Sequence, residues 1–215
     1  MALSIYTIFT VFINMNNSLC DSLNKTWKTT TKILLGQEIG ELTEFEEWLS
    51  YYSPKPANRE SSVSGKNVTL ATDHYSKNAH FISSDEITEK SIDPLSINEI
   101  KDIDSLICAI SEKWQYCGNR ALGNSHSIES SDLVVDSSNI LKSTNIQQSS
   151  NLYSCFLVRL GGKNSFGSGY SGNSEFMVRV VGSFNAHRCL EGQFLLDSSD
   201  IYFSHYIIGC TDVMF

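Results

Sequence analysis

The chain is poor in proline and in positive charge, and it has no long apolar run. It has 215 residues and only 3 prolines, which excludes a collagen-like chain. Its 16 basic and 24 acidic residues give a net charge of -8, which works against binding to nucleic acid or to an anionic membrane. No segment reaches the ~20 apolar residues of a membrane-spanning helix. We therefore expect neither nucleic acid nor a membrane as a partner.

Common catalytic and metal-binding signatures are also missing. The patterns G-x-S-x-G, H-E-x-x-H and G-x-x-x-x-G-K-[ST] do not occur, and no C-x-x-C pair is present. The cysteines are scattered: Cys20, Cys108, Cys117, Cys155, Cys189 and Cys210. This spacing favours free thiols in a reducing compartment, either the cytoplasm or a virion, with secretion as the alternative. We expect no metal, no cofactor and no catalytic residues.

The N-terminus contains an apolar stretch, Leu3–Ile13, that resembles the hydrophobic region of a signal peptide. No lysine or arginine precedes Lys25, and no small-x-small cleavage site follows, so a secretory signal is the less favoured interpretation. The alternatives are a packed strand or helix, or non-native sequence upstream of a start at Met15.

Helical patterns dominate the first half. Leu19, Leu23 and Trp27 are four residues apart, and Gly36 offers a stop. Thr43-x-x-Glu46 predicts a capping box for a short amphipathic helix that ends before Pro54. Its acids, Glu44, Glu46 and Glu47, are expected to face solvent.

A polar connecting segment with two strand-like pieces, Val68–Thr72 and Ala79–Ser83, precedes a further helix. Ser96-x-x-Glu99 predicts a second capping box. The apolar face that follows consists of Ile100, Ile103, Ile107, Ile110 and Trp114. We expect this helix to cap the structure that comes after it.

The second half repeats. Three tracks of apolar residues recur at intervals of 23 to 26 residues. They are Ile128, Leu152, Phe176 and Ile201; Leu133, Leu157, Val181 and Tyr206; and Ile140, Phe166, Leu190 and Val213. Serine and asparagine precede many of them, and asparagine side chains can hydrogen-bond along a stack of turns.

This repeat predicts a parallel β-helix with about four coils of about 24 residues, and the preference of parallel crossovers favours right-handed winding. The overall class is then α+β, with a helical region at 1–117 capping a β-solenoid at 118–215. An antiparallel sandwich is the alternative, but it does not explain a constant interval. The last coil lacks a polar cap, so we expect the chain to be truncated or to meet a protein partner or a second copy at its C-terminal end.

The phrases Ser149–Cys155 and Ser198–Phe215 resemble the repeats of an uncharacterised serine-, asparagine- and cysteine-rich β-solenoid family of phage, archaeal and candidate-phylum bacterial genomes. The resemblance covers about residues 116–215. The family's members carry more cysteine and usually continue with a closing segment. The resemblance implies a solenoid and, by analogy, a virion or assembly role, and it transfers no catalytic residue.

Three groups of residues deserve a chemical interpretation. Gly167–Gly172 matches G-x-G-x-x-G with Glu191 downstream, but its β-prone context predicts a solenoid corner rather than a phosphate site. His187, Cys189, His205 and Cys210 on adjacent coils are expected to be packing residues rather than zinc ligands. Asp197, Asp200, Arg179 and Arg188 are candidates for a glycan lyase or hydrolase. We favour a non-enzymatic structural or binding module and keep the glycan enzyme as the alternative.

Overall fold

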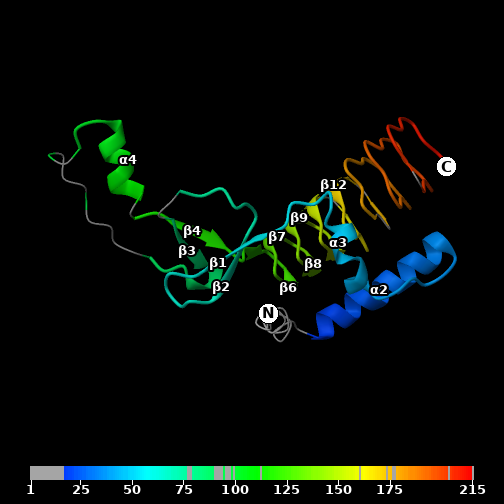
Figure 1. The fold of residues 1–215 in the computed structure, drawn as a ribbon, viewed down its shortest axis with the longest axis horizontal. Coiled ribbons are helices and arrows are strands. Elements are labelled where there is room, and N and C mark those ends of the chain that lie inside the picture. Colours follow the sequence, from blue (N-terminus) through cyan, green and yellow to red (C-terminus); the bar gives the residue numbers. More distant parts are fainter. Residues whose placement is uncertain are drawn as a thin grey trace, which may run out of the picture.

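The computed structural model describes residues 17–76, 79–89, 94, 98, 100–111, 113–159, 161–172, 174–175, 178–202 and 204–214. It has the predicted α+β class, with helices in the N-terminal region and a parallel β-solenoid after them (Figure 1). Leu3–Ile13, Met15, the capping residues Ser96 and Glu99, and Phe176 lie outside the described residues.

The described helices and strands follow one another along the chain in the order of their numbers. The helices are α2 (Asn17–Leu35), the 3-10 turn η2 (Leu42–Phe45), α3 (Glu46–Leu49), the 3-10 turn η3 (Ser84–Glu86) and α4 (Ile103–Ser111). The strands before the solenoid are β1 (Ala57–Glu60), β2 (Asn67–Leu70), β3 (His80–Ser83) and β4 (Gln115–Gly118). The solenoid strands are β5 (Ala121–Leu122), β6 (His126–Glu129), β7 (Asp132–Val135), β8 (Ser138–Leu141), β9 (Thr144–Gln147), β10 (Ser150–Tyr153), β11 (Phe156–Val158) and β12 (Gly169–Ser171).

The solenoid strands form two parallel sheets, one on each side of the coil. Their orders are β10-β8-β6 and β12-β11-β9-β7-β5. Ile128 is paired with Ile140, and Ile140 with Leu152, so successive turns are 12 residues apart. The predicted coil of 24 residues is therefore wrong. A turn has two sides of about six residues rather than three longer sides, and the observed interval spans two turns.

Serines close the corners between the two sheets. Ser131 Oγ accepts a hydrogen bond from Ser143 N–H one turn later at 3.0 Å and donates to the Glu129 carbonyl at 2.7 Å. The same pair of bonds recurs at the next two corners, formed by Ser137 and Ser143. A chain that bends every six residues leaves backbone donors without a strand partner, and a serine hydroxyl satisfies them. The serine content thus follows from the narrowness of the coil.

Several asparagines occupy a backbone conformation that suits this residue. Asn139, Asn145 and Asn151 have φ values of 56°, 58° and 56°, in the left-handed region that asparagine tolerates better than most residues. On one side these side chains form a ladder, because Asn139 Nδ2 donates to Asn151 Oδ1 at 2.9 Å and Asn151 Nδ2 to Asn164 Oδ1 at 2.8 Å. The predicted hydrogen bonding of asparagines along the stack is confirmed.

Helix α2 packs along one flank of the solenoid (Figure 1). The residues of this flank point out of the coil and succeed one another at steps of 12 or 13: Leu141, Tyr153, Phe166, Val178 and Leu190. The predicted stripe Leu19, Leu23 and Trp27 is buried against them. The helix ends at Leu35, before Gly36 at φ 76°, as the sequence predicts.

The chain after α2 folds back over the same flank as η2 and α3. The predicted capping box at Thr43 is wrong, because η2 begins at Leu42 with Glu41 as its N-cap and α3 begins only at Glu46. The short helix itself is confirmed, and Leu49 is fully buried in the cluster with Trp27.

The first turn of the solenoid is covered by strands. β2 pairs with β1 in antiparallel register and lies so close to β4 that a Cβ on Gly118 would come within 2.3 Å of the Thr69 carbonyl oxygen. Helix α4, expected to be the cap, has no buried residue among those described. The cap prediction fails because Val68 and Leu70 of β2 already occupy this position.

The predicted strands Val68–Thr72 and Ala79–Ser83 correspond to β2 and β3. No helix of the described segments is long and apolar enough to cross a membrane.

Candidate binding groove

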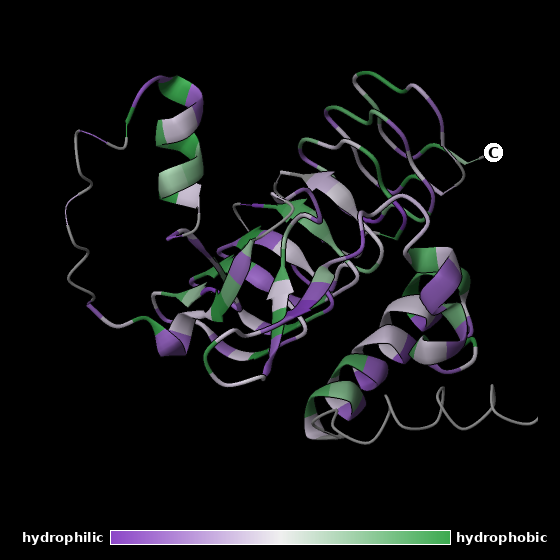
Figure 2. Ribbon diagram, turned by 60° about the vertical axis from the view of Figure 1, so that its left-hand side comes forward, coloured by the Kyte–Doolittle hydropathy of each residue, from purple (hydrophilic) through white to green (hydrophobic). Residues whose placement is uncertain are grey.

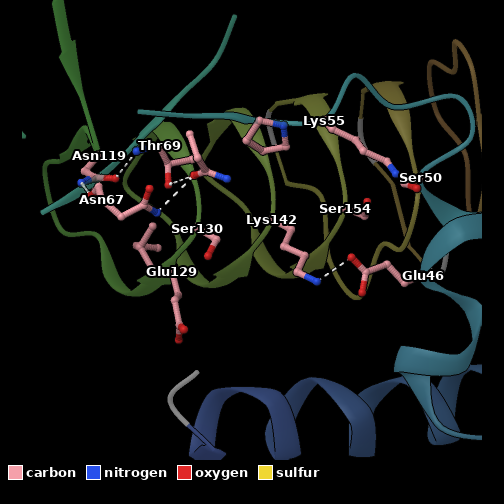
Figure 3. A pocket seen from close by; sticks show the side chains of 13 residues that line it. Glu46, Ser50, Lys55, Asn67, Thr69, Asn119, Glu129, Ser130, Lys142 and Ser154 are labelled. Carbon is pink, nitrogen blue, oxygen red and sulfur yellow. Dashed lines mark hydrogen bonds and ion pairs between the residues drawn. The ribbon is translucent and has the colours of Figure 1, made fainter. Parts of the chain in front are cut away.

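A groove with a volume of about 590 Å³ lies between a corner of the solenoid and the segment that follows α3 (Figure 3). Its floor is a column of corner residues one turn apart, Ser130, Lys142 and Ser154. Its lining consists of Glu46, Ser50, Lys55, Pro56, Asn58, Asn67, Thr69, Asn119, Ile128, Glu129, Ser130, Lys142 and Ser154. Most of these side chains end in amide, hydroxyl or charged groups.

One end of the groove is built from hydrogen-bonded amides (Figure 3). Asn119, at φ 52°, accepts a hydrogen bond from Thr69 N–H at 2.9 Å and donates to the Asn67 carbonyl at 3.0 Å. Asn58 Oδ1 accepts from Asn67 Nδ2 and Thr69 Oγ1, both at 3.2 Å. The Asn119 amide is held by the backbone of β2, and the Asn58 amide by side chains of β2, so this wall is preorganised.

The end of the groove away from these asparagines contains an ion pair. Glu46 of α3 and Lys142 of the solenoid are 2.5 Å apart, and the Lys142 ammonium lies 5.7 Å from the centre of the Tyr153 ring. Glu46 was expected to be a solvent-facing acid on the outer side of its helix. It is half-buried because α3 folds onto the solenoid, which turns this acid toward the corner column.

Helix α3 is seated on a glycine of the same corner column. Gly167 has φ +68°, and a Cβ there would lie 2.6 Å from the Leu49 carbonyl oxygen. One turn further, the Arg179 guanidinium contacts the rings of Trp48 and Tyr52 at 4.8 and 4.7 Å. Two further contacts therefore hold α3 against the solenoid, one on each side of Gly167. They are the ion pair of Lys142 with Glu46 and the stacking of Arg179 on Trp48.

Replacing Gly167 with alanine is expected to reduce the free energy of unfolding by about 2–5 kcal/mol. The left-handed conformation costs alanine about 1–2 kcal/mol, and displacing the α3 backbone adds about 1–3 kcal/mol. The matched control is Gly65→Ala, because Gly65 has φ +72° and open space around it. Urea unfolding followed by tryptophan fluorescence measures both. Equal losses in the two variants would show that α3 is not seated on Gly167.

The glycine-rich segment Gly167–Gly172 is a packing feature, as predicted. Gly169 lies in β12, and a Cβ on Gly172 would come within 2.1 Å of the Phe184 carbonyl oxygen. The described residues that follow it form turns and bridges rather than a helix, so the segment lacks the helix N-terminus of a phosphate site.

The other predicted candidates do not form a cleft. Arg188 and Asp200 make an ion pair at 3.6 Å with both side chains partly exposed, and Asp197 is exposed. Arg179 is engaged by aromatic rings and by Glu191 at 3.1 Å. None of these residues lines the groove.

The six cysteines are all free thiols. Burial raises the pKa of Cys155 and of Cys189 to about 12, so both are neutral packing residues at physiological pH. Cys189 and Cys210 lie together in one buried cluster, while His187 is exposed. Over the part of the chain that the structure describes, no group of three or more metal-ligating side chains comes together.

The groove itself was missed by the sequence analysis. Glu46 and Lys142 are 96 residues apart, and no local pattern connects them. A partial signal exists, since Lys142 occupies a corner that the neighbouring turns fill with Ser130 and Ser154. Chemically, amides, hydroxyls and a neutralised ion pair suit a polar ligand held by hydrogen bonds. No family model, curated protein or solved structure matches this chain.

Proposed function

We propose that the chain is a non-enzymatic structural or binding module that presents a rigid solenoid surface within a larger assembly, such as a virion. The observation that carries this proposal is a set of exposed apolar side chains on the last turns, here named the outer apolar face. Its members are Phe184, Phe194, Leu196, Tyr206 and Ile208, exposed by 59%, 55%, 41%, 77% and 82%.

The spacing of these residues makes the face continuous. Phe184, Leu196 and Ile208 follow one another at 12-residue steps, and so do Phe194 and Tyr206. The rings of Phe194 and Tyr206 are stacked, with centroids 5.3 Å apart and an interplanar angle of 9°. Apolar segments therefore recur along the last turns (Figure 2). Contiguous apolar surface of this kind is typical of protein interaction sites.

The covered flank of the same solenoid supports this interpretation. There the outward apolar column from Leu141 to Leu190 is buried under α2 and α3. The outer apolar face is a second set of outward apolar columns, and no described segment of the chain covers it to a similar degree. A protein partner or a second copy would bury it, and this supports an association that involves the C-terminal turns.

The glycan lyase or hydrolase is the less favoured function. An acid–base mechanism needs two carboxyl groups free to exchange protons across one substrate. Asp200 is paired with Arg188, and Glu46 in the groove is paired with Lys142. These ion pairs favour binding over catalysis.

Site-specific photo-crosslinking in the native cell tests the proposal. A photoreactive residue replaces Tyr206 or Leu196 on the outer apolar face, and in controls it replaces Val63 or Ile87, both 60% exposed elsewhere. We expect discrete protein adducts from positions 206 and 196 and none from the controls. Equal labelling at all four positions, or none on the face, would refute an assembly role for this surface.

A further inference from the structure

Helix α4 carries another apolar surface that no described segment of the chain buries. Ile103 and Ile107 are exposed by 75% and 49%, and Trp114 just beyond the helix by 46%. The spacing of four residues puts Ile103 and Ile107 on one side of the helix. The helix nevertheless starts in an ordered way, because Ser105 N–H donates to Asp102 Oδ1 at 2.8 Å and Asp102 N–H donates to Ser105 Oγ at 3.0 Å. An ordered helix with an exposed apolar side lacks the surface that would stabilise it.

The outer apolar face has the dimensions that α4 needs. The helix has nine residues, so it is about 13 Å long. The face with Tyr170, which is 50% exposed, extends over three steps between turns, or about 14 Å at ~4.8 Å per step. The opposite flank shows that this solenoid binds an amphipathic helix on such a column, since α2 lies there.

Charge also matches at one end. Asp102 and Asp104 lie at the N-terminus of α4 and are exposed. Arg159 is exposed on the same sheet as the outer apolar face, about two turns before Phe184. An α4 helix aligned with its N-terminus toward Arg159 would bring opposite charges together while its isoleucines meet the face.

Within one chain the two surfaces cannot meet fully. Helix α4 is connected to β4 by three residues, which span at most about 14 Å. The outer apolar face with Tyr170 begins about four turns beyond β4, or about 19 Å along the coil. Figure 1 accordingly shows α4 and the last turns at opposite ends of the molecule.

We infer that α4 of one copy docks on the outer apolar face of a second copy, so that the chains associate head to tail. The inference rests on the proposed function and names its partner as another copy of this chain. Such a contact is heterologous, because each copy contributes α4 at one end and the outer apolar face at the other. The copies therefore form either a closed ring or an open chain. A contact made by one short helix is small, so we expect a dissociation constant in the micromolar range.

Sedimentation velocity from about 1 to about 500 µM tests this inference with two charge-introducing variants. Ile107→Glu removes the helix side of the contact, and Phe194→Glu removes the face side. Ile87→Glu is the control, because Ile87 is exposed to a similar extent and lies on neither of the two surfaces. We expect the wild type and the control to form species larger than dimers, and each single variant to lose about 30-fold or more in affinity.

The decisive sample is an equal mixture of the two single variants. Each retains the half that the other lacks, so the mixture should form dimers with wild-type affinity and nothing larger. A monomeric wild type, a mixture without dimers, or an Ile107→Glu variant that still associates would overturn the inference, the last by indicating a face-to-face pair. These failures are distinct from failure of the proposed function, because crosslinking at positions 206 and 196 to a different protein would leave that proposal standing.

Discussion

Replacing Asp132 with asparagine is expected to lower the free energy of unfolding by about 3–5 kcal/mol, because it leaves a cation without its counter-charge. The Asp132 side chain is fully buried, and Arg120 binds it through two side-chain donors at 3.0 and 2.6 Å. Two backbone N–H groups also donate hydrogen bonds to the Asp132 carboxylate, that of Ala71 at 2.9 Å and that of Arg120 at 3.0 Å. One carboxylate therefore joins β2, which covers the first turn, to β7 inside the solenoid.

The control for this variant is Asp136→Asn, four residues along the chain. Asp136 is exposed and accepts one hydrogen bond in the structure, from Asn124 N–H at 2.9 Å, so its loss is expected to cost about 1 kcal/mol or less. Thermal unfolding compares the two variants. Amide hydrogen exchange at Ala71 adds a local readout, since Asp132→Asn should release that N–H while Asp136→Asn should not. Similar melting temperatures for both variants would contradict the structural role of Asp132.

The parallel solenoid was predictable because stacking places equivalent side chains in the same position on every turn. The turn length was not, because isoleucine, leucine and valine replace one another freely in the interior. Ile128 and Leu152 were recognised as equivalent, whereas Ile140, which lies between them and pairs with both, was assigned to another track. The hydrogen bonds of the corner serines fix the shorter interval, since each serine binds the backbone 12 residues later.

The groove and the cap were not predictable for a different reason. Both depend on the N-terminal segments returning to a flank or an end of the solenoid, and that return is decided by packing rather than by local sequence. The apolar stripe of α2 shows that the helix needs a partner surface, but nothing in Leu19 or Trp27 says that the partner is the column from Leu141 to Leu190. The helix before the solenoid was predicted correctly as amphipathic and wrongly as a cap, because amphipathicity shows only that a partner is needed.

Trp27→Ala is expected to cost about 3–5 kcal/mol, the range found for large-to-small changes of a buried tryptophan. Trp27 is fully buried, and its ring lies 5.4 Å from that of Phe45 and 5.1 Å from that of Phe166. It therefore joins α2, η2 and the solenoid in one contact. The cavity left by alanine cannot close, because the floor beneath it is the rigid ladder that contains Tyr153 and Phe166.

Trp27→Phe is the informative control. The indole Nε1 is buried and has no hydrogen-bond partner among the described residues, so phenylalanine removes a polar group that gains nothing from burial. The smaller ring loses some contact, and we expect a net cost of less than about 1.5 kcal/mol. Ile33→Ala, on the exposed side of the same helix, should cost still less. Urea unfolding measured by circular dichroism ranks the three variants. If Trp27→Ala unfolds like Ile33→Ala, α2 does not pack on the solenoid, and the flank beneath it is a second open apolar surface.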